Sequence, residues 1–362
     1  MSPTPPSDQE LAERTLELCR IPSPIGQEAA IADHLERWAK DVFGPKEVLR
    51  HSHSLVLGNL KDDPRPTVAL FGHLDTVPAH PGDGPPGIDG DRIVGLGASD
   101  MKGGIAVMMA LAERLPRARL PVNMALVLYE REEGPYLENG LGPLLERIDG
   151  LRRIRFGIAL EPTDNVVQVG CVGSIHATLR FRGKSAHSAR PWQGTNAVHA
   201  AGPFLAELLA RPRTHVRVGS FDFYEVASIT RASGGRARNV VPDEFELNLN
   251  YRFAPGRSLE EAQEDVRRLV AGRAEIEFTD LSPAGRVCED NPFFQQLLRL
   301  SGAPAESKQA WTDVARLSAH GIDAVNFGPG ETAQAHQVNE SASVAALGRA
   351  WAALCRFLTA GL

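Results

Sequence analysis

Hydrophobic residues recur with a period near 3.6 in several parts of the chain, and this period predicts helices. The predicted helices span residues 8–19, 28–42, 101–115, 292–300 and 341–358. Between them lie short apolar runs bounded by Gly, Pro and Asp, which are typical of buried strands. The predicted strands span residues 55–60, 67–71, 122–129, 156–160 and 324–327. Strands that alternate with helices indicate an α/β layer with a mixed, largely parallel sheet flanked by helices.

The middle of the chain has a different pattern, because its strands alternate apolar and polar residues. Predicted strands at 174–181, 224–230, 244–253 and 275–278 and helices at 196–210 and 258–270 follow the order β-α-β-β-α-β. That order is typical of a ferredoxin-like α+β unit. We therefore expect one domain formed by residues 1–172 and 287–362, with a second domain, residues 173–286, inserted into it.

Composition narrows the possible classes of function. The chain has 362 residues, of which 43% are hydrophobic and 23% charged, as in an ordinary globular protein. The formal net charge of −6 argues against nucleic acid and acidic membranes as partners, since both require a basic surface. The four cysteines are far apart, so no disulfide framework is expected and a cytoplasmic location fits best. The polar, proline-rich N-terminus is not expected to be a signal peptide, and no apolar run is long enough to cross a bilayer.

Side chains that bind metals follow the predicted strands. His73 and Asp75 come after the strand at 67–71 and, in an extended chain, point the same way. His73 can bind a metal, and Asp75 is then placed to hold its imidazole in the binding tautomer. The alternative is a surface His-x-Asp sequence of the kind that occurs by chance.

Asp100 is expected to open the helix at 101–115, shortly before Gly103 and Gly104. A carboxylate there could bridge two metal ions through its two oxygens. The alternative is a plain helix N-cap, a role that Asp often fills. The glycines shift the balance toward a site, because they allow a close approach of the backbone.

Glu132 and Glu133 are adjacent like charges at the end of an apolar strand, which is costly near an interior unless a cation compensates. One can bind metal while its neighbour takes a proton from an activated water. Glu161, after the next strand, supplies a further oxygen ligand. His336 follows the turn Gly328-Pro329-Gly330 and can close a second metal site.

His187 lies on the turn after a strand of the predicted inserted domain, in the segment Gly183-Lys184-Ser185-Ala186-His187-Ser188-Ala189-Arg190. It could donate a hydrogen bond to a substrate carbonyl oxygen. The remaining histidines lie in polar or helical contexts, and we interpret them as solvated or structural.

Several motifs occur in order along nearly the whole chain: GHLDTVP, GASDMKGG, EEG, EPT, GKSAHSARP and a late GPGE with AH. Taken together they resemble the M20 family of di-zinc metallopeptidases and deacylases. Within the family the similarity is greatest to the desuccinylases, in GCVG (170–173), AHSAR (186–190), GTNAVH (194–199), NVVPD (239–243) and NYRFAP (250–255). The chain departs from commoner members at Tyr129-Glu130-Arg131 and at Gly95-Leu96-Gly97.

The resemblance implies a residue-by-residue assignment. One zinc ion would be held by His73, Asp100 and Glu161. A second would be held by Asp100, Glu133 and His336. Each subunit would thus bind two Zn²⁺, with Co²⁺ as a possible substitute.

The remaining assignments concern catalysis and the substrate. The resemblance implies that Glu132 is the general base and that Asp75 orients His73. The inserted domain would act as a lid and form a homodimer, so that His187 reaches the active site of the partner subunit. The residues expected to bind the substrate are Arg190, Asn239, Arg252 and Gly330.

The expected reaction is hydrolysis of the amide of an anionic N-acyl amino acid by metal-activated water. Other deacylases of the family, such as acetylornithine deacetylases and aminoacylases, and carboxypeptidases of the family remain alternatives, since all could share this metal site. A non-catalytic descendant that binds a small molecule or a partner is the alternative from a different class.

Overall fold

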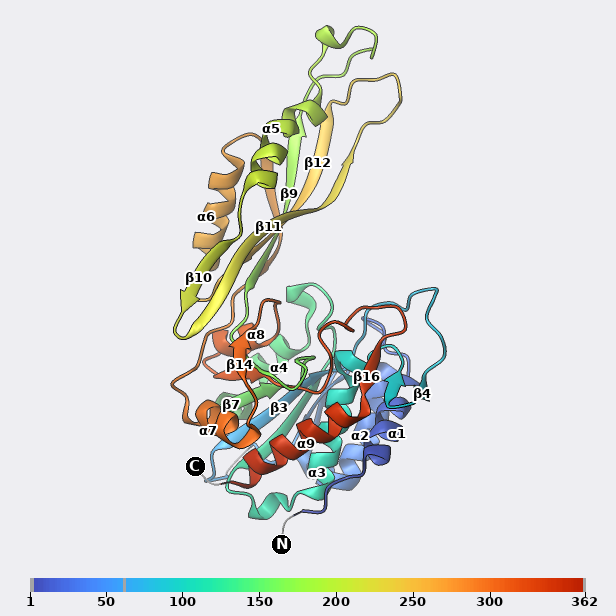
Figure 1. The fold of residues 1–362 in the computed structure, drawn as a ribbon, viewed down its shortest axis with the longest axis vertical. Coiled ribbons are helices and arrows are strands. Elements are labelled where there is room, and N and C mark those ends of the chain that lie inside the picture. Colours follow the sequence, from blue (N-terminus) through green and yellow to red (C-terminus); the bar gives the residue numbers. More distant parts are fainter. Residues whose placement is uncertain (1–2, 61–62, 361–362) are drawn as a thin grey trace. The chain divides into compact units, whose positions relative to one another are not determined.

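The computed structural model describes residues 3–60 and 63–360, which form two compact units (Figure 1). The first unit consists of the described residues up to Gly170, of Arg286–Lys308 and of the described residues from Thr312 onward. The second unit consists of Cys171–Gly285 together with the three residues Gln309–Trp311. The chain therefore passes from the first unit to the second and back twice.

The first unit is built on an eight-stranded sheet with the order β1-β2-β6-β3-β7-β15-β8-β14. Its strands are β1 (Val48–His51), β2 (Ser54–Leu57), β3 (Thr67–His73), β6 (Asn123–Tyr129), β7 (Ile154–Ala159), β8 (Val167–Val169), β14 (Ala305–Ser307) and β15 (Ala324–Asn326). Strand β3 is parallel to β6 and β7, and β15 is parallel to β7, whereas β1, β2 and β8 also form antiparallel pairs. The predicted mixed, largely parallel α/β sheet is confirmed.

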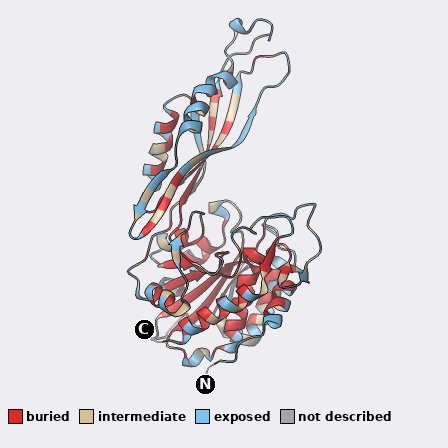
Figure 2. Ribbon diagram, in the orientation of Figure 1, coloured by how far each residue is buried: buried red, intermediate tan, exposed pale blue. Residues whose placement is uncertain are grey.

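The central strands β3 and β6 consist mainly of apolar residues because helices cover both faces of the sheet. Every residue of β3 and β6 is buried (Figure 2). On one face, Phe71 and Val127 belong to the same buried cluster as Leu141 and Leu317, which lie in the helices α4 (Leu141–Arg147) and α8 (Val314–Ala319). On the other face the backbone of Gly72 approaches the side chains of the helix α3 (Gly103–Arg114).

The other helices of this unit are α1 (Asp8–Cys19), α2 (Ala29–Phe43), α7 (Pro292–Ser301) and α9 (Val344–Thr359). Helix α1 begins with a capping box in which Ser7 and Glu10 exchange hydrogen bonds with each other's backbone N–H. Helices α1, α3 and α9 contact one another, and α7 contacts α9. No helix among the described residues is long and apolar enough to cross a membrane.

Three short strands form a separate small sheet, β16-β5-β4, in this unit. They are β4 (Gly87–Asp89), β5 (Arg92–Val94) and β16 (Ser341–Ser343). The predicted boundary of the last helix is therefore wrong. This helix begins at Val344 rather than at residue 341, because residues 341–343 pair with β5.

The second unit is a five-stranded antiparallel sheet with the order β10-β11-β12-β9-β13. Its elements are β9 (Gly173–Arg182), α5 (Ala197–Ala210), β10 (Thr214–Val218), β11 (Phe221–Gly234), β12 (Glu244–Phe253), α6 (Leu259–Val270) and β13 (Glu275–Ser282). The predicted β-α-β-β-α-β order is present, with β10 added at one edge. Alternate residues of β9 and β12, such as Leu179 and Leu249, pack against Phe204 of α5 and Val266 of α6.

All four cysteines are buried, and none forms a disulfide within the described residues. Cys19, Cys288 and Cys355 lie in the first unit and Cys171 begins the second.

Candidate metal centre

The candidate site lies in the first unit, at the carboxyl edge of its parallel strands. His73 is the last residue of β3, the pair Glu132 and Glu133 follows β6, and Glu161 follows β7. Because parallel strands end at the same edge of a sheet, these side chains converge although they are far apart in sequence.

Asp100 lies between two histidines. Its Oδ1 atom is 3.1 Å from Nε2 of His73, and its Oδ2 atom is 3.7 Å from Nε2 of His336. His336 also contacts Glu133, with 2.9 Å between Nε2 and Oε1. One ligand atom from each of His73, Asp100 and Glu133 lies within 4.8 Å of the other two. A carboxylate whose two oxygens face two different histidines is suited to bridge two cations.

Asp75 links the segment that follows β3 to the segment that follows β6. Its carboxylate accepts the backbone N–H groups of Glu132 and Glu133, both at 2.9 Å. The ring Nδ1 of His73 lies 3.0 Å from the backbone oxygen of Asp75 and 3.6 Å from its carboxylate. If Nδ1 carries the proton, Nε2 has its lone pair toward Asp100, which is the tautomer that a metal ligand requires. Asp75 is therefore in a position to orient both the histidine and the glutamate pair.

The electrostatics of the cluster require a compensating charge. Burial and the charge of Glu161 raise the pKa of Glu132 well above its usual value. Burial also raises the pKa of Glu161 to about 7, although the charge of His73 opposes this, and the Oε1 atom of Glu161 is buried without a hydrogen-bond partner. The hydrogen bond to Glu133 raises the pKa of His336 to about 9. Carboxylates and imidazoles in this arrangement are a donor set that suits divalent cations such as zinc.

Glycines bring the two irregular ligand segments against the sheet. A side chain at Gly328 would meet the backbone oxygens of Leu160 and Glu161 at 2.3 and 2.4 Å, and one at Gly330 would meet the backbone oxygen of Ser99 at 2.1 Å. The loop before His336 therefore lies directly against the segments that carry Glu161 and Asp100. His336 itself has φ 62°, so the chain turns sharply where its ring enters the site.

The local structure around Asp100 differs from the prediction. Helix α3 begins at Gly103 rather than at Asp100, and Asp100 has extended dihedral angles (φ −122°, ψ 92°) and a cis peptide bond to Met101. Asp100 is thus not the N-cap of this helix, because Lys102 occupies that position. The interpretation as an N-cap is wrong, and the carboxylate faces the histidines instead.

Two buried residues near the cluster were not predicted from the sequence. Lys308 donates to the backbone oxygen of Pro162 at 3.3 Å, and its charge contributes to the lowered pKa of Asp100 and opposes the rise in the pKa of Glu161. It sits in a short polar segment that gives no local sign of burial, so only the fold could reveal it.

Asp313 is fully buried and accepts hydrogen bonds from Asn139 at 2.7 Å and from Arg316 at 2.9 Å. Burial and the charge of Asp313 raise the pKa of Tyr129, which is buried at the end of β6 just before the glutamate pair. In the sequence, Asp313 precedes a short helix and is indistinguishable from an ordinary cap.

The remaining predicted residues divide between the two units. Gly330 lies in the first unit, in the loop that precedes His336, whereas His187, Arg190, Asn239 and Arg252 lie in the second.

His187 and Asn239 lie on adjoining loops: the N–H of Ser188 donates to the backbone oxygen of Asn239 at 2.9 Å. The N–H of Ala189 donates to Nδ1 of His187 at 3.1 Å, so the neutral ring carries its proton on Nε2. Arg190 is exposed and its N–H bonds the backbone oxygen of His187.

Arg252 lies on β12, where its Nε donates to Oδ1 of Asn250 at 2.9 Å. Burial lowers the pKa of its guanidinium. No carboxylate of the described residues lies within ion-pair distance of Arg252, which leaves its charge available for an anion.

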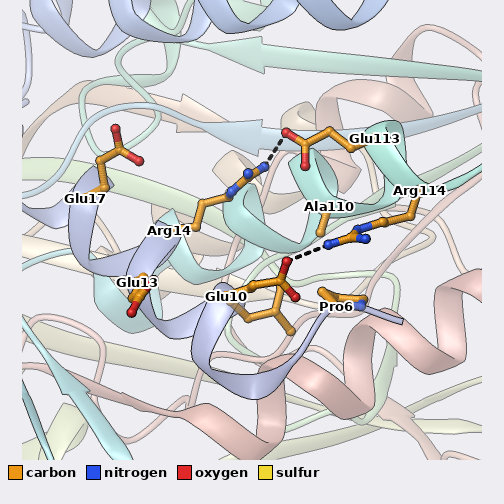
Figure 3. A pocket seen from close by; sticks show the side chains of 9 residues that line it. Pro6, Glu10, Glu13, Arg14, Glu17, Ala110, Glu113 and Arg114 are labelled. Atoms are coloured by element: carbon orange, nitrogen blue, oxygen red, sulfur yellow. Dashed lines mark hydrogen bonds and ion pairs between the residues drawn. The ribbon is translucent and has the colours of Figure 1, made fainter. Parts of the chain in front are cut away.

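A surface cavity of about 480 Å³ between α1 and α3 lies apart from this cluster (Figure 3). It is lined by charged side chains that pair with one another, Arg14 with Glu113 and Arg114 with Glu10, both at 2.6 Å. Glu113 and Arg114 are at the C-terminal end of α3, whereas Asp100 precedes its N-terminal end. The cavity supplies no residue to the candidate metal centre.

Comparison with known proteins identifies the family of this chain. Residues 69–360 match the family described as peptidase family M20/M25/M40. A putative succinyl-diaminopimelate desuccinylase DapE of Mycobacterium tuberculosis strain H37Rv is 36% identical over 347 residues, which cover 96% of this chain and 97% of that protein. A succinyl-diaminopimelate desuccinylase of Corynebacterium glutamicum is 35% identical over 338 residues, 91% of each chain.

Solved structures share the fold. Aminopeptidase PepT from Bacillus cereus superposes with a TM-score of 0.78 at 22% identity and covers 98% of both chains. The Bacillus subtilis YXEP protein, described as a dinuclear metal binding peptidase, superposes with a TM-score of 0.69 at 17% identity and covers 97% of both chains. The family that the motifs predict is confirmed, and the chain belongs to peptidase family M20/M25/M40.

Proposed function

We propose that this protein is a metal-dependent amide hydrolase that removes the succinyl group from N-succinyl-LL-2,6-diaminopimelate, a step of diaminopimelate and lysine biosynthesis. The position of Asp100, with one oxygen toward each of two histidines, carries the proposal of a two-metal hydrolase. The choice of substrate is supported by the desuccinylases that align with more than nine tenths of the chain.

The proposed ligand sets divide the cluster between two ions. His73, Asp100 and Glu161 would hold one zinc, and Asp100, Glu133 and His336 would hold the other. Cobalt would substitute, since it accepts the same nitrogen and oxygen donors. The unpartnered Oε1 of Glu161 and the contact between Glu133 and His336 support this division.

The bound cations would acidify a water molecule and polarise the substrate carbonyl. Glu132, which is not a proposed ligand, accepts the proton from that water. The resulting nucleophile attacks the amide carbon, and Glu132 then gives its proton to the leaving nitrogen. Asp75 keeps Glu132 in place through the backbone hydrogen bond at 2.9 Å.

His187 is proposed to donate from Nε2 to the oxygen on which negative charge develops, a use of its proton that the bond from Ala189 to Nδ1 supports. Arg190, Asn239, Arg252 and Gly330 are proposed to hold the substrate. Arg252 is suited to a carboxylate because its guanidinium lacks an ionic partner in the described part of the chain.

The second unit is proposed to act as a lid and to form a homodimer, so that His187 serves the partner subunit. An apolar outer face of α5 supports a contact between copies: Val198 and Leu209 are exposed, and the helix buries few of its residues in its own unit. Trp192, in the loop before this helix, is also exposed. The mass in solution, measured by light scattering for the wild-type chain and for Leu209→Glu, tests the dimer.

We also propose a cytoplasmic location. The four buried cysteines support it, because none forms a disulfide within the described residues and thiols stay reduced in that compartment.

A substrate panel tests the function. The chelator-treated protein, reconstituted with zinc or cobalt, is assayed with N-succinyl-LL-2,6-diaminopimelate, N-acetylornithine, N-acyl amino acids and dipeptides. We expect kcat/KM for the succinyl substrate to exceed the others by about two orders of magnitude, because a smaller acyl group would leave charged donors unpaired. A preference for N-acetylornithine or a dipeptide would contradict the proposed substrate. The absence of any metal-dependent hydrolysis would contradict the proposal that this protein is an amide hydrolase.

A further inference from the structure

Glu340 carries a further buried carboxylate beside the metal cluster. No hydrogen bond or ion pair joins this carboxylate to a side-chain atom of the proposed ligands within the described residues. Glu340 is 1% exposed and follows His336 by four residues. Its Oε2 atom accepts the backbone N–H of Gly97 at 3.0 Å, and its Oε1 atom accepts the N–H groups of Ser99 and Asp100 at 2.7 and 2.8 Å.

These three N–H groups need an external acceptor. The segment 97–100 is irregular, with Gly97 at φ 83° and Asp100 in an extended conformation, so it cannot satisfy its amides by regular helical bonds. A carboxylate that accepts three backbone N–H groups supplies charge-assisted hydrogen bonds at this point. Glu340 therefore fixes the backbone from which the Asp100 side chain projects.

Further contacts lock the same two segments together. Ser99 Oγ donates to the backbone oxygen of Ser341 at 3.0 Å and accepts the N–H of Glu331 at 2.9 Å. The N–H of Gly95 donates to the backbone oxygen of Glu340 at 2.8 Å. The segment that carries Asp100 and the segment that carries His336 thus form one interlocked structure.

The other proposed ligands are held differently. His73 ends strand β3 and Glu161 closely follows strand β7, so both are positioned by the hydrogen-bonded sheet. Asp100 and His336 have no such support from a strand. Of the two proposed ion sites, the one formed by Asp100, Glu133 and His336 therefore depends on Glu340 for two of its three ligands.

We propose that Glu340 is a positioning residue that aligns Asp100 with His336 and so sets the affinity of the second metal site. The proposal rests on the two-metal centre put forward above. Glu340 is not one of the proposed metal ligands, and its effect is transmitted through the backbone of Asp100 and the loop of His336.

The test is Glu340→Gln. The amide has the size of the carboxylate but only one acceptor oxygen, so its NH₂ group must face at least one of the three backbone N–H groups. Metal-free protein is titrated with Co²⁺, and binding is followed by calorimetry and by the visible absorption of each bound ion. We expect two ions per chain in both proteins. The ion held by Asp100, Glu133 and His336 should bind about ten- to a hundredfold more weakly in the variant, and the other ion, which shares only Asp100 with that site, should lose less affinity.

Two further variants make the result specific. Glu225→Gln is the matched control, because Glu225 is a buried glutamate of the second unit that accepts the backbone N–H of Ala254 at 3.1 Å. It should leave both affinities unchanged. Ser99→Ala removes the hydroxyl bonds to the His336 segment but keeps Glu340, and should weaken the same second ion by a smaller factor. It also provides the measurement if Glu340→Gln does not fold.

The outcomes separate this inference from the proposed function. Wild-type protein that binds two ions, with variants that lose affinity for neither or for both equally, overturns the role of Glu340 alone. Wild-type protein that does not bind a pair of ions overturns the two-metal centre, and the role of Glu340 with it.

Discussion

Most candidate residues of the two units lie in opposite environments, although His336 of the first unit is exposed and Arg252 of the second is partly buried. In the first unit, His73, Asp75, Asp100 and Glu161 are all at most 9% exposed and lie within one crowded cluster. In the second unit, His187, Arg190 and Asn239 are exposed on loops. The first arrangement is electrostatically costly by itself, whereas the second costs little until a substrate arrives.

This difference separates the binding of metal from the binding of substrate. A crowded, buried set of carboxylates is stable when cations neutralise it, so the first unit is built around bound metal. Exposed donors on loops hold no fixed charge partner and are suited to a ligand that comes and goes. If the comparison is right, changes in the first unit should affect chemistry and metal-dependent stability, and changes in the second should affect turnover and substrate affinity without altering metal content.

The largest effect is expected for Glu132→Gln. The amide cannot take a proton from water, so kcat should fall by about 10³- to 10⁴-fold while two metal ions remain bound. Turnover is measured with the preferred substrate, and metal content by elemental analysis. Glu130→Gln is the matched control, because Glu130 is a buried glutamate two residues earlier whose Oε1 accepts the N–H of His53. Near-normal turnover of Glu132→Gln would remove its assignment as the general base.

The sequence was sufficient to predict that the candidate residues after the strands converge. His73, Glu133 and Glu161 lie at one edge of the sheet because apolar runs mark the strands, and parallel strands bring their carboxyl ends together. The dependence of Asp100 on its surroundings could not be predicted. Its conformation is set by Glu340, which is 240 residues away in sequence, and the local pattern favours an ordinary helix start. Lys308 was missed for the same reason, since its burial depends on contacts with distant parts of the chain.

The next effect concerns the cost of the crowded cluster in the absence of metal. The pKa of Glu161 is raised from 4.5 to about 7, so the folded chain binds this proton more tightly than the unfolded chain, and stability falls as the pH rises through that range. His336, with a pKa raised from 6.5 to about 9, continues the decline between those values. Chelator-treated protein should therefore be less stable at pH 9 than at pH 5.

Glu161→Gln isolates the contribution of Glu161 to this decrease in stability with pH. The variant should lack the loss of unfolding free energy between pH 4.5 and 7, which is on the order of 3 kcal/mol for a single group at 1.36 kcal/mol per pKa unit. Urea unfolding of the metal-free wild type and variant across this range measures it, with the exposed Glu207→Gln as control. Added zinc should reduce the slope in the wild type, because metal binds the deprotonated ligands more tightly as the pH rises. Parallel pH profiles for wild type and Glu161→Gln would contradict the account.

In the second unit, His187→Ala should lower kcat by about 10²-fold, the effect of removing one donor to a developing oxyanion. Metal content and stability should not change, because the ring is exposed and accepts only the local N–H of Ala189. His199→Ala, which removes an exposed histidine from α5 of the same unit, serves as the control. Unchanged kinetics for His187→Ala would end its assignment as a donor. A loss of bound metal would indicate that His187 contributes to metal binding rather than to the contact with the substrate.

The smallest effect is expected for Arg252→Ala. If Arg252 pairs with a substrate carboxylate, its loss should raise KM about tenfold, the typical contribution of one charge-assisted hydrogen bond, with a smaller change in kcat. Arg252→Lys should recover part of the affinity, because the charge remains but the fixed geometry of the guanidinium is lost. Arg180→Ala is the control on the same sheet, since Arg180 already pairs with Glu246 at 2.7 Å and is not available to a ligand.

Substrates that lack the succinyl carboxylate show which carboxylate Arg252 binds. If Arg252 binds the succinyl carboxylate, the Arg252→Ala variant and the wild type should have nearly equal KM values for these substrates. A tenfold difference that persists with those substrates would assign Arg252 to the carboxylate of the amino acid instead, and no difference with any substrate would leave it as a structural residue of the sheet.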